Sequence, residues 1–113
     1  MNSTISMANV WEVDRIAEWG VRNFGINMEF NMARKGQWEV SNLPVELKRD
    51  WVRKFGSKPW NSAVLSRVNS ASLDGVAWIN FTQFIRRWDA QWGLDFAATF
   101  PEYHAVIKKH QLW

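Results

Sequence analysis

Apolar residues recur at helical spacing over residues 7–24, near the N-terminal end of the chain. The repeating positions are Val10, Val13, Ile16, Ala17, Gly20 and Phe24. Charged residues fill the opposite side, and Glu18 precedes Arg22 by four positions, an order that favours a helical ion pair. Gly25 follows the last periodic residue and suits the left-handed position that ends many helices. The pattern predicts an amphipathic helix over residues 7–24.

The period then changes from helical spacing to strict alternation. Residues 26–32 alternate apolar and polar side chains, and residues 37–40 alternate again after a connection that contains Gly36. Alternation of this kind is typical of half-buried strands. The two segments predict a β-hairpin that packs on helices, because an isolated two-stranded ribbon is marginal in water.

Four further helical patterns follow, and each has a local start or stop signal. They cover residues 43–55, 59–68, 80–92 and 101–110. We expect Asn42 and Ser57 to cap the first two, and Asn80 with Gln83 to form a capping box at the third. Residues 69–74 predict a loop, and residues 76–79 predict a short extended or irregular run.

These elements predict a mainly helical α+β fold, with about five helices and one small β-hairpin after the first helix. The expected order is α-β-β-α-α-α-α. No linker rich in Gly, Pro or Ser divides the chain, so we expect one compact domain over residues 1–113.

Nine tryptophans in 113 residues make the chain unusually aromatic. Tryptophan is a large core residue but also a frequent anchor of binding surfaces. Trp51, Trp88 and Trp92 lie on the apolar stripes of predicted helices, and we expect Trp19 and Trp78 to be packed in the core as well. The other four, which are the candidates for exposed rings, are Trp11, Trp38, Trp60 and Trp113.

Composition excludes several kinds of chemistry. With no cysteine, the chain has no disulfides, no thiol catalysis and no cysteine-based zinc site. The net charge of +3 permits an acidic partner without demanding one. Neither a signal peptide nor an apolar run of about 20 residues is present, so we expect a soluble cytoplasmic protein with no membrane association.

No catalytic or metal-binding pattern stands out. His104 and His110 lie six residues apart, so they cannot chelate a metal in the i,i+4 manner. Glu29 and Glu39 would face each other only as part of a solvated hairpin face. Residues 70–84 resemble the end of an EF-hand loop and its exiting helix, but Ser70, Ser72 and Phe81 stand where that motif needs carboxylates. We therefore expect no enzyme activity, no cofactor and no metal.

Basic and aromatic residues interleave between Lys48 and Trp60, and the predicted hairpin has a basic tip. The side chains most suited to bind a partner are Arg34, Lys35, Trp38, Arg53, Lys54, Lys58, Trp60 and Trp113. Tryptophan and arginine often dominate protein interfaces, which favours another protein as the partner. The alternative is a nucleic acid held by the Lys48–Trp60 segment. By analogy, an inhibitor or accessory factor of the type that phages and mobile elements encode fits this size and composition.

Overall fold

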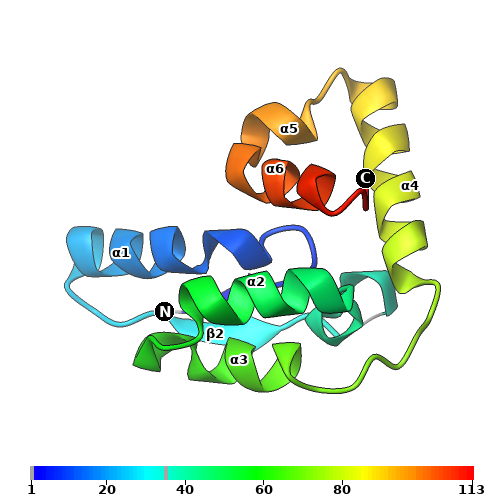
Figure 1. Cartoon of the computed structure of the whole chain (residues 1–113). Coiled ribbons are helices and arrows are strands. Elements are labelled where there is room, and N and C mark those ends of the chain that lie inside the picture. The colour runs from blue at the N-terminus through cyan, green and yellow to red at the C-terminus, as the bar shows by residue number, and fades with distance from the viewer. Residues whose placement is uncertain (1, 35) are drawn as a thin grey trace.

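The computed structural model describes residues 2–34 and 36–113, and most of these residues are helical (Figure 1). The strands and the short 3-10 helices, labelled η, are β1 Asn2–Ile5, η1 Val10–Glu12, β2 Glu29–Met32, η2 Gly36–Trp38, η3 Val40–Asn42 and η4 Pro59–Asn61. The α-helices are α1 Val13–Phe24, α2 Val45–Phe55, α3 Ser62–Val68, α4 Ala77–Trp92, α5 Phe96–Thr99 and α6 Pro101–Lys109. The predicted mainly helical α+β fold class is confirmed.

The sheet differs from the predicted hairpin. β1 pairs with β2 in parallel, in a register that runs from Asn2 opposite Glu29 to Ile5 opposite Met32. The α1 helix supplies the crossover that two parallel strands require. The strand predicted over residues 26–32 therefore exists in its last four residues, but its partner is the N-terminal segment and not residues 37–40.

Residues 37–40 do not form a strand because their side chains are used elsewhere. Trp38 packs its ring edge-on against Phe81 and Phe84 of α4, with centroids 6.0 and 5.1 Å away. Val40, two residues later, is fully buried in the core. The 3-10 turn η2 packs against α4, and the next turn, η3, packs against α3.

Every layer of the fold contributes to one hydrophobic core. Its largest fully buried side chains are Ile5, Met7, Val10, Val13, Val40, Leu47, Trp51, Val64, Val68, Phe81, Tyr103 and Ile107. Two of them donate hydrogen bonds to distant backbone carbonyls, Trp51 Nε1 to Val10 at 2.8 Å and the Tyr103 hydroxyl to Met7 at 2.7 Å. Burial raises the pKa of Tyr103, so its hydroxyl keeps the proton that it donates. These bonds hold α2 and α6 against the N-terminal segment.

Gly25 ends a helix as predicted, and Gly93 ends a second helix in the same way. Gly25 after α1 and Gly93 after α4 adopt left-handed φ angles of 66° and 65°. The Gly25 N–H donates to the carbonyl of Val21, and the Gly93 N–H donates to that of Asp89. Side chains other than glycine rarely adopt this backbone conformation, so the two helix ends are fixed locally by the sequence.

The predicted caps of α2 and α3 are wrong. Asn42 is buried, and its amide instead binds the segment Ser72–Asp74 and the carbonyl of Gly36. Pro44 precedes α2 in the cap position. Likewise, Ser57 does not cap η4, because the residue in the cap position directly before η4 is Lys58. The predicted stripe of α2, which includes Leu47, Trp51 and Phe55, is buried as expected.

α4 begins three residues before the predicted start. Asp74 Oδ1 accepts the N–H of Val76 at 3.0 Å, and this turn allows the helix to begin at Ala77. Residues 76–79 are therefore not extended, and Asn80 lies within the helix. The short α5, capped by the Asp95 side chain, was not predicted, whereas α6 begins at Pro101 as expected.

The helices surround the small sheet unequally (Figure 1). α1 and α2 lie above the strands, α3 lies below, and α4 stands at one side. α5 and α6 return across the top of the molecule, where α6 runs beside α2. α1 and α4 therefore occupy opposite ends of the fold.

Among the described residues, no helix is both long and apolar enough to cross a membrane.

Candidate functional site

A groove runs along the outer half of α1. It has a volume of about 390 Å³ and is lined mainly by carbon atoms of Ala17, Glu18, Val21, Arg22, Asn27, Met28 and Trp60. α1 buries Val13, Ala17 and Gly20 against the core, and its last turns continue beyond the core. The chain then folds back under the helix, where Met28 approaches Gly20 closely. We refer to this hollow as the α1 groove.

Trp60 forms one wall of the α1 groove and is held in place by polar contacts. Its indole Nε1–H donates to Asp14 Oδ1 on α1 at 3.4 Å. Lys58 pairs with the same carboxylate, and its Nζ lies 5.8 Å from the centre of the Trp60 ring. Asn61 also donates to Asp14, at 3.0 Å. These contacts therefore orient an aromatic side chain that is 49% exposed.

More apolar surface surrounds the C-terminal end of α1. Five large apolar side chains at this end of the molecule are 41–54% exposed: Trp19, Val21, Phe24, Ile26 and Trp60. The rings of Trp19 and Phe24 contact each other, with centroids 5.3 Å apart. Met28 lines both the α1 groove and the neighbouring hollow beside Trp19. Contiguous apolar surface exposed on a protein is often an interaction site.

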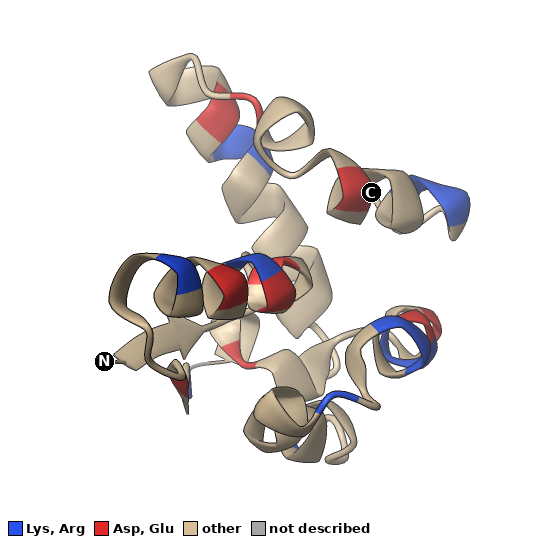
Figure 2. Cartoon of the chain, turned by 90° about the vertical axis from the view of Figure 1, so that its left-hand side faces the viewer, with Lys and Arg blue, Asp and Glu red and all other residues tan. Residues whose placement is uncertain are grey.

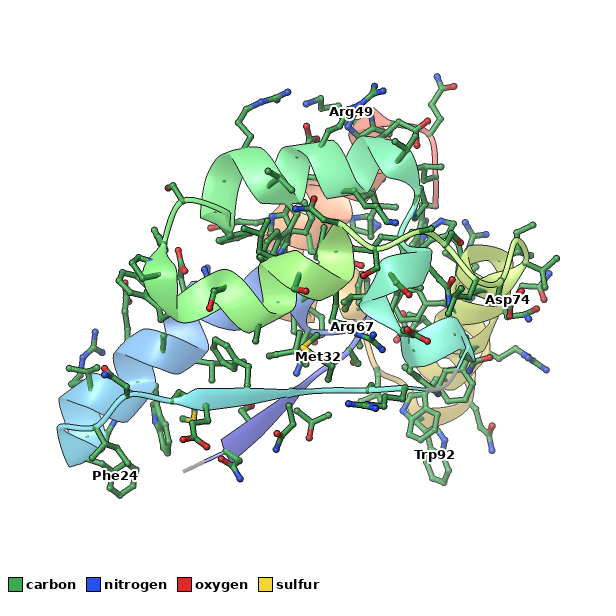
Figure 3. The ribbon with its side chains drawn as sticks, turned by 90° about the horizontal axis from the view of Figure 1, so that it is seen from below. Phe24, Met32, Arg49, Arg67, Asp74 and Trp92 are labelled. Carbon is green, nitrogen blue, oxygen red and sulfur yellow. The ribbon has the colours of Figure 1, made fainter. Side chains whose placement is uncertain are left out.

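A second aromatic surface lies on α4, at the opposite end of the molecule. Phe84, Trp88 and Trp92 follow one another at i,i+4 spacing, with ring centroids 5.1 and 6.4 Å apart. Trp38 continues the series at the base, 5.1 Å from Phe84. Trp88 is 45% exposed and Trp92 is 62% exposed. We refer to these four residues as the α4 ridge; Figure 3 shows Trp92 projecting from it.

The side chains predicted to bind a partner do not form one site. Lys58 and Trp60 lie at the α1 groove, and Trp38 lies at the base of the α4 ridge. Trp113 is half-buried, where it stacks on Phe96 with the centroids 5.2 Å apart. Arg34 is exposed after β2.

Arg53 and Lys54 project from the outer side of α2, and Lys35 lies outside the described residues.

Carboxylates neutralise much of the basic segment between Lys48 and Trp60. Three of its cations form ion pairs: Arg53 with Asp50 at 3.3 Å, Lys54 with Glu102 at 2.8 Å, and Lys58 with Asp14. Lys48 Nζ donates to the carbonyl of Ser70, and burial lowers the pKa of this lysine. In the view of Figure 2, basic and acidic segments are interspersed along the ribbon. The segment therefore lacks the concentrated positive stripe that nucleic-acid domains often carry.

The assignment of tryptophans to core and surface is only partly correct. Trp51 is buried as predicted, but Trp19, Trp88 and Trp92, which were placed in the core, are 45–62% exposed. Trp11, a predicted surface candidate, is buried and stacks on Tyr103 with the centroids 5.2 Å apart. Periodicity identifies the apolar side of a helix, but it does not tell where the helix leaves the core.

Polar residues considered for catalysis have structural partners. The His104 ring contacts Trp113, with centroids 5.1 Å apart, and His110 Nε2 lies 2.7 Å from Asp50 Oδ2. Glu39 accepts from Arg67 at 2.9 Å and not from a hairpin partner. Within residues 2–34 and 36–113, no group of three or more His, Asp or Glu side chains is arranged to hold a metal ion.

The apolar pattern of the sequence did not reveal the exposed side of α1. Trp19 and Val21 are large apolar residues of α1 that lie off the stripe formed by Val13 and Ala17. A helix whose apolar residues extend beyond one stripe either is buried on several sides or offers a surface to a partner. That excess was the available signal.

Comparisons with known proteins give no match: no family model, no curated protein and no solved structure is significantly similar to this chain. The function must therefore be inferred from the chemistry and geometry of its own surfaces.

Proposed function

We propose that this chain is a small non-enzymatic binding protein that holds an apolar segment of another protein in the α1 groove. The observation that carries the proposal is the group of five large apolar side chains, each 41–54% exposed, around the end of α1. A partner that covers this surface would gain about 25 cal/mol of binding free energy for each Å² of apolar area that it removes from water.

The groove favours an amphipathic helix as the bound segment. Such helices place their apolar side chains in a hydrophobic groove at i, i+3 and i+4 positions. The two charged lining residues, Glu18 and Arg22, lie one helical turn apart and have opposite signs. Charges at the rim of an interface contribute little affinity, but they select the orientation in which the partner helix binds.

Trp60 is the expected anchor of this interface. A rigid indole loses little conformational entropy on binding, and tryptophan is enriched among residues that dominate interface energy. The contacts from Asp14 and Lys58 supply that rigidity. Truncation of such an anchor costs about 2 kcal/mol or more, or roughly a 30-fold loss of affinity.

The proposal is tested by affinity capture from native lysate, with and without nuclease, using matched variants. Val21 in the groove and Val45 at the start of α2 are 54% and 53% exposed, so Val21→Lys and Val45→Lys are comparable changes at different places. A partner should be lost with Val21→Lys and with Trp60→Ala, and kept with Val45→Lys. Equal capture by all four proteins would refute the proposal.

Binding of nucleic acid by the Lys48–Trp60 segment is the alternative function. The ion pairs of Arg53, Lys54 and Lys58 count against it, because those cations already have partners. The capture experiment separates the two: under the alternative, nuclease removes the captured material, and affinity falls steeply as salt is raised.

A cytoplasmic location and an inhibitory or accessory role complete the proposal. The absence of cysteine agrees with a reducing compartment. The inhibitory role is supported only by analogy of size and composition, and identification of the captured partner tests it.

A further inference from the structure

A second groove lies between α2 and α3. It has a volume of about 470 Å³, and its lining consists of Val45, Lys48, Arg49, Val52, Arg53, Val68 and Asn69. Figure 3 shows the two helices side by side, with Arg49 at the outer edge of α2. We refer to this hollow as the α2–α3 groove. It shares no lining residue with the α1 groove, so it is a separate surface.

The charged lining of the α2–α3 groove is entirely positive. Its charged residues are Lys48, Arg49 and Arg53, and among the described residues no carboxylate lines it. Within residues 2–34 and 36–113, neither Lys48 nor Arg49 forms an ion pair with a carboxylate. The α3 helix, which forms the opposite wall, has no acidic residue. The groove can therefore receive negative charge from a partner.

Two acidic residues of α2 neighbour the groove without lining it. Asp50 pairs with Arg53 at 3.3 Å, but it also lies 2.7 Å from His110 Nε2 and 3.6 Å from Lys109 Nζ, at the end of α6. Glu46 is the other. The three cations of the groove together with Lys109 stand against these two carboxylates, so the local charge stays positive.

The apolar lining repeats along α2. Val45 and Val52 are seven residues apart, which is two helical turns or about 10.5 Å. A helix bound in a groove presents apolar side chains at i, i+3, i+4 and i+7, so its repeat matches this spacing. We infer that the α2–α3 groove binds an acidic amphipathic helix of a partner protein, with apolar side chains on the valines and carboxylates on the three cations.

The lining favours such a helix over other anionic ligands. Single-stranded nucleic acid stacks its bases on aromatic side chains, whereas this groove offers valines in their place. A surface that binds a membrane buries its apolar side by about 5–10 Å in the lipid. Here the valine side chains are shorter than the lysine and arginine side chains beside them, so the apolar part is recessed.

The test uses the full chain and a fluorescein-labelled synthetic helix of about 18 residues. The peptide carries leucines at i, i+3, i+4 and i+7, glutamates beside them and alanines elsewhere. Anisotropy titrations should detect binding that weakens as salt is raised, because the charges that attract the peptide are exposed. Replacing the glutamates by lysines should weaken binding by about tenfold or more. Replacing the leucines by serines should do the same, because the apolar contact is lost.

Arg49→Glu places a carboxylate against the glutamates of the peptide and should weaken binding by about tenfold. Arg49→Lys keeps the charge and should stay within about threefold of the wild type. Arg87→Glu is the matched control, because Arg87 is also an exposed helical arginine without a recorded ion pair, but it lies on α4. It makes the same change in net charge and should leave peptide binding nearly unchanged.

Three results would each overturn the inference: no binding, equal binding of the lysine peptide, or equal loss with Arg49→Glu and Arg87→Glu. Tighter binding of an oligonucleotide or of anionic vesicles, lost with Arg49→Glu, would assign the groove to those anions instead. Loss of peptide binding with Trp60→Ala would place the peptide in the α1 groove and would also overturn it. Partner capture through the α1 groove is a separate measurement, because it depends on Trp60 and Val21 and not on Arg49.

Discussion

Asp14 on α1 accepts a hydrogen bond from the indole N–H of Trp60 on η4, across 3.4 Å and 46 residues of sequence. The same carboxylate receives Lys58 and Asn61. One acidic side chain thus joins the η4 turn to α1 and fixes the aromatic wall of the α1 groove. Asp14 therefore contributes both to the stability of the fold and to the shape of the α1 groove, so it is the first residue to substitute.

Asp14→Ala should lower the free energy of unfolding by about 2 kcal/mol, because it removes hydrogen bonds to a charged acceptor and leaves Lys58 without its partner. Urea denaturation followed by circular dichroism measures the change. Glu18→Ala, an exposed acidic position on the same helix, should change stability by less than about 0.5 kcal/mol. Equal effects of the two substitutions would show that the Asp14 contacts do not stabilise η4.

Trp51→Ala and Trp60→Ala should differ sharply in their effect on folding. Trp51 is fully buried and donates to the Val10 carbonyl, so its truncation should cost about 3–5 kcal/mol. Trp60 is half exposed and makes one long hydrogen bond, so its truncation should cost about 1 kcal/mol or less. Chemical denaturation of both variants checks this, and a large loss for Trp60→Ala would make that ring part of the core.

Asn42→Ala should destabilise the loop before α4. The Asn42 Oδ1 accepts from the Ser72 hydroxyl and from the backbone N–H groups of Leu73 and Asp74, and its Nδ2 donates to the Gly36 carbonyl at 2.9 Å. Loss of these bonds leaves backbone groups without partners, which should cost about 2–3 kcal/mol.

Asn31→Ala, at an exposed position on β2, is the control for Asn42→Ala and should be nearly neutral. Hydrogen exchange gives a second measurement, because the amides of residues 73 and 74 should lose protection only in Asn42→Ala. Unchanged protection of these amides would contradict the role assigned to Asn42.

Acid should destabilise the contact between α2 and α6. The hydrogen bond with His110, followed by the charge of Lys109, holds the pKa of Asp50 below its usual range, and Lys54 lowers the pKa of Glu102. A carboxyl whose pKa is lower in the folded state stabilises the protein above the unfolded pKa of about 4. This stabilisation is lost as the pH falls through the lowered folded values.

Unfolding free energies should therefore decrease from about pH 4 downward, and Asp50→Asn should flatten that decrease. Urea midpoints measured between about pH 6 and 2 give both curves. Parallel curves for the wild type and Asp50→Asn would show that Asp50 contributes nothing to the acid dependence.

Local patterns in the sequence predicted most of the helices. Residues 13–24 and 45–55 form helices because their apolar spacing, which concerns neighbours three and four residues apart, is a local property. Gly25 and Gly93 end α1 and α4 for the same reason, since the left-handed conformation is a property of the residue itself. The helix caps were predicted less well, because the Asn42 side chain binds a loop distant in sequence instead of the start of α2.

The sheet could not be predicted from local patterns. Residues 29–32 have the alternation of a strand, but nothing in it specifies the strand with which they pair. The short, polar segment from Asn2 gave no strong signal, and only the crossover through α1 brings it beside β2. The packing of Trp38 against α4 then excluded the hairpin that the sequence favoured.

What the sequence determined by itself is the mainly helical class, the helix ends at two glycines and the lack of cysteine chemistry. The tertiary structure decided where each tryptophan lies, because burial depends on which elements meet and where each helix extends past the core. The outer turns of α1 and α4 leave the core, so Trp19, Trp88 and Trp92 face solvent while Trp11 is covered. The tertiary structure also decided which charged residues form ion pairs. Lys54 contacts Glu102, 48 residues away, only because α2 and α6 pack together.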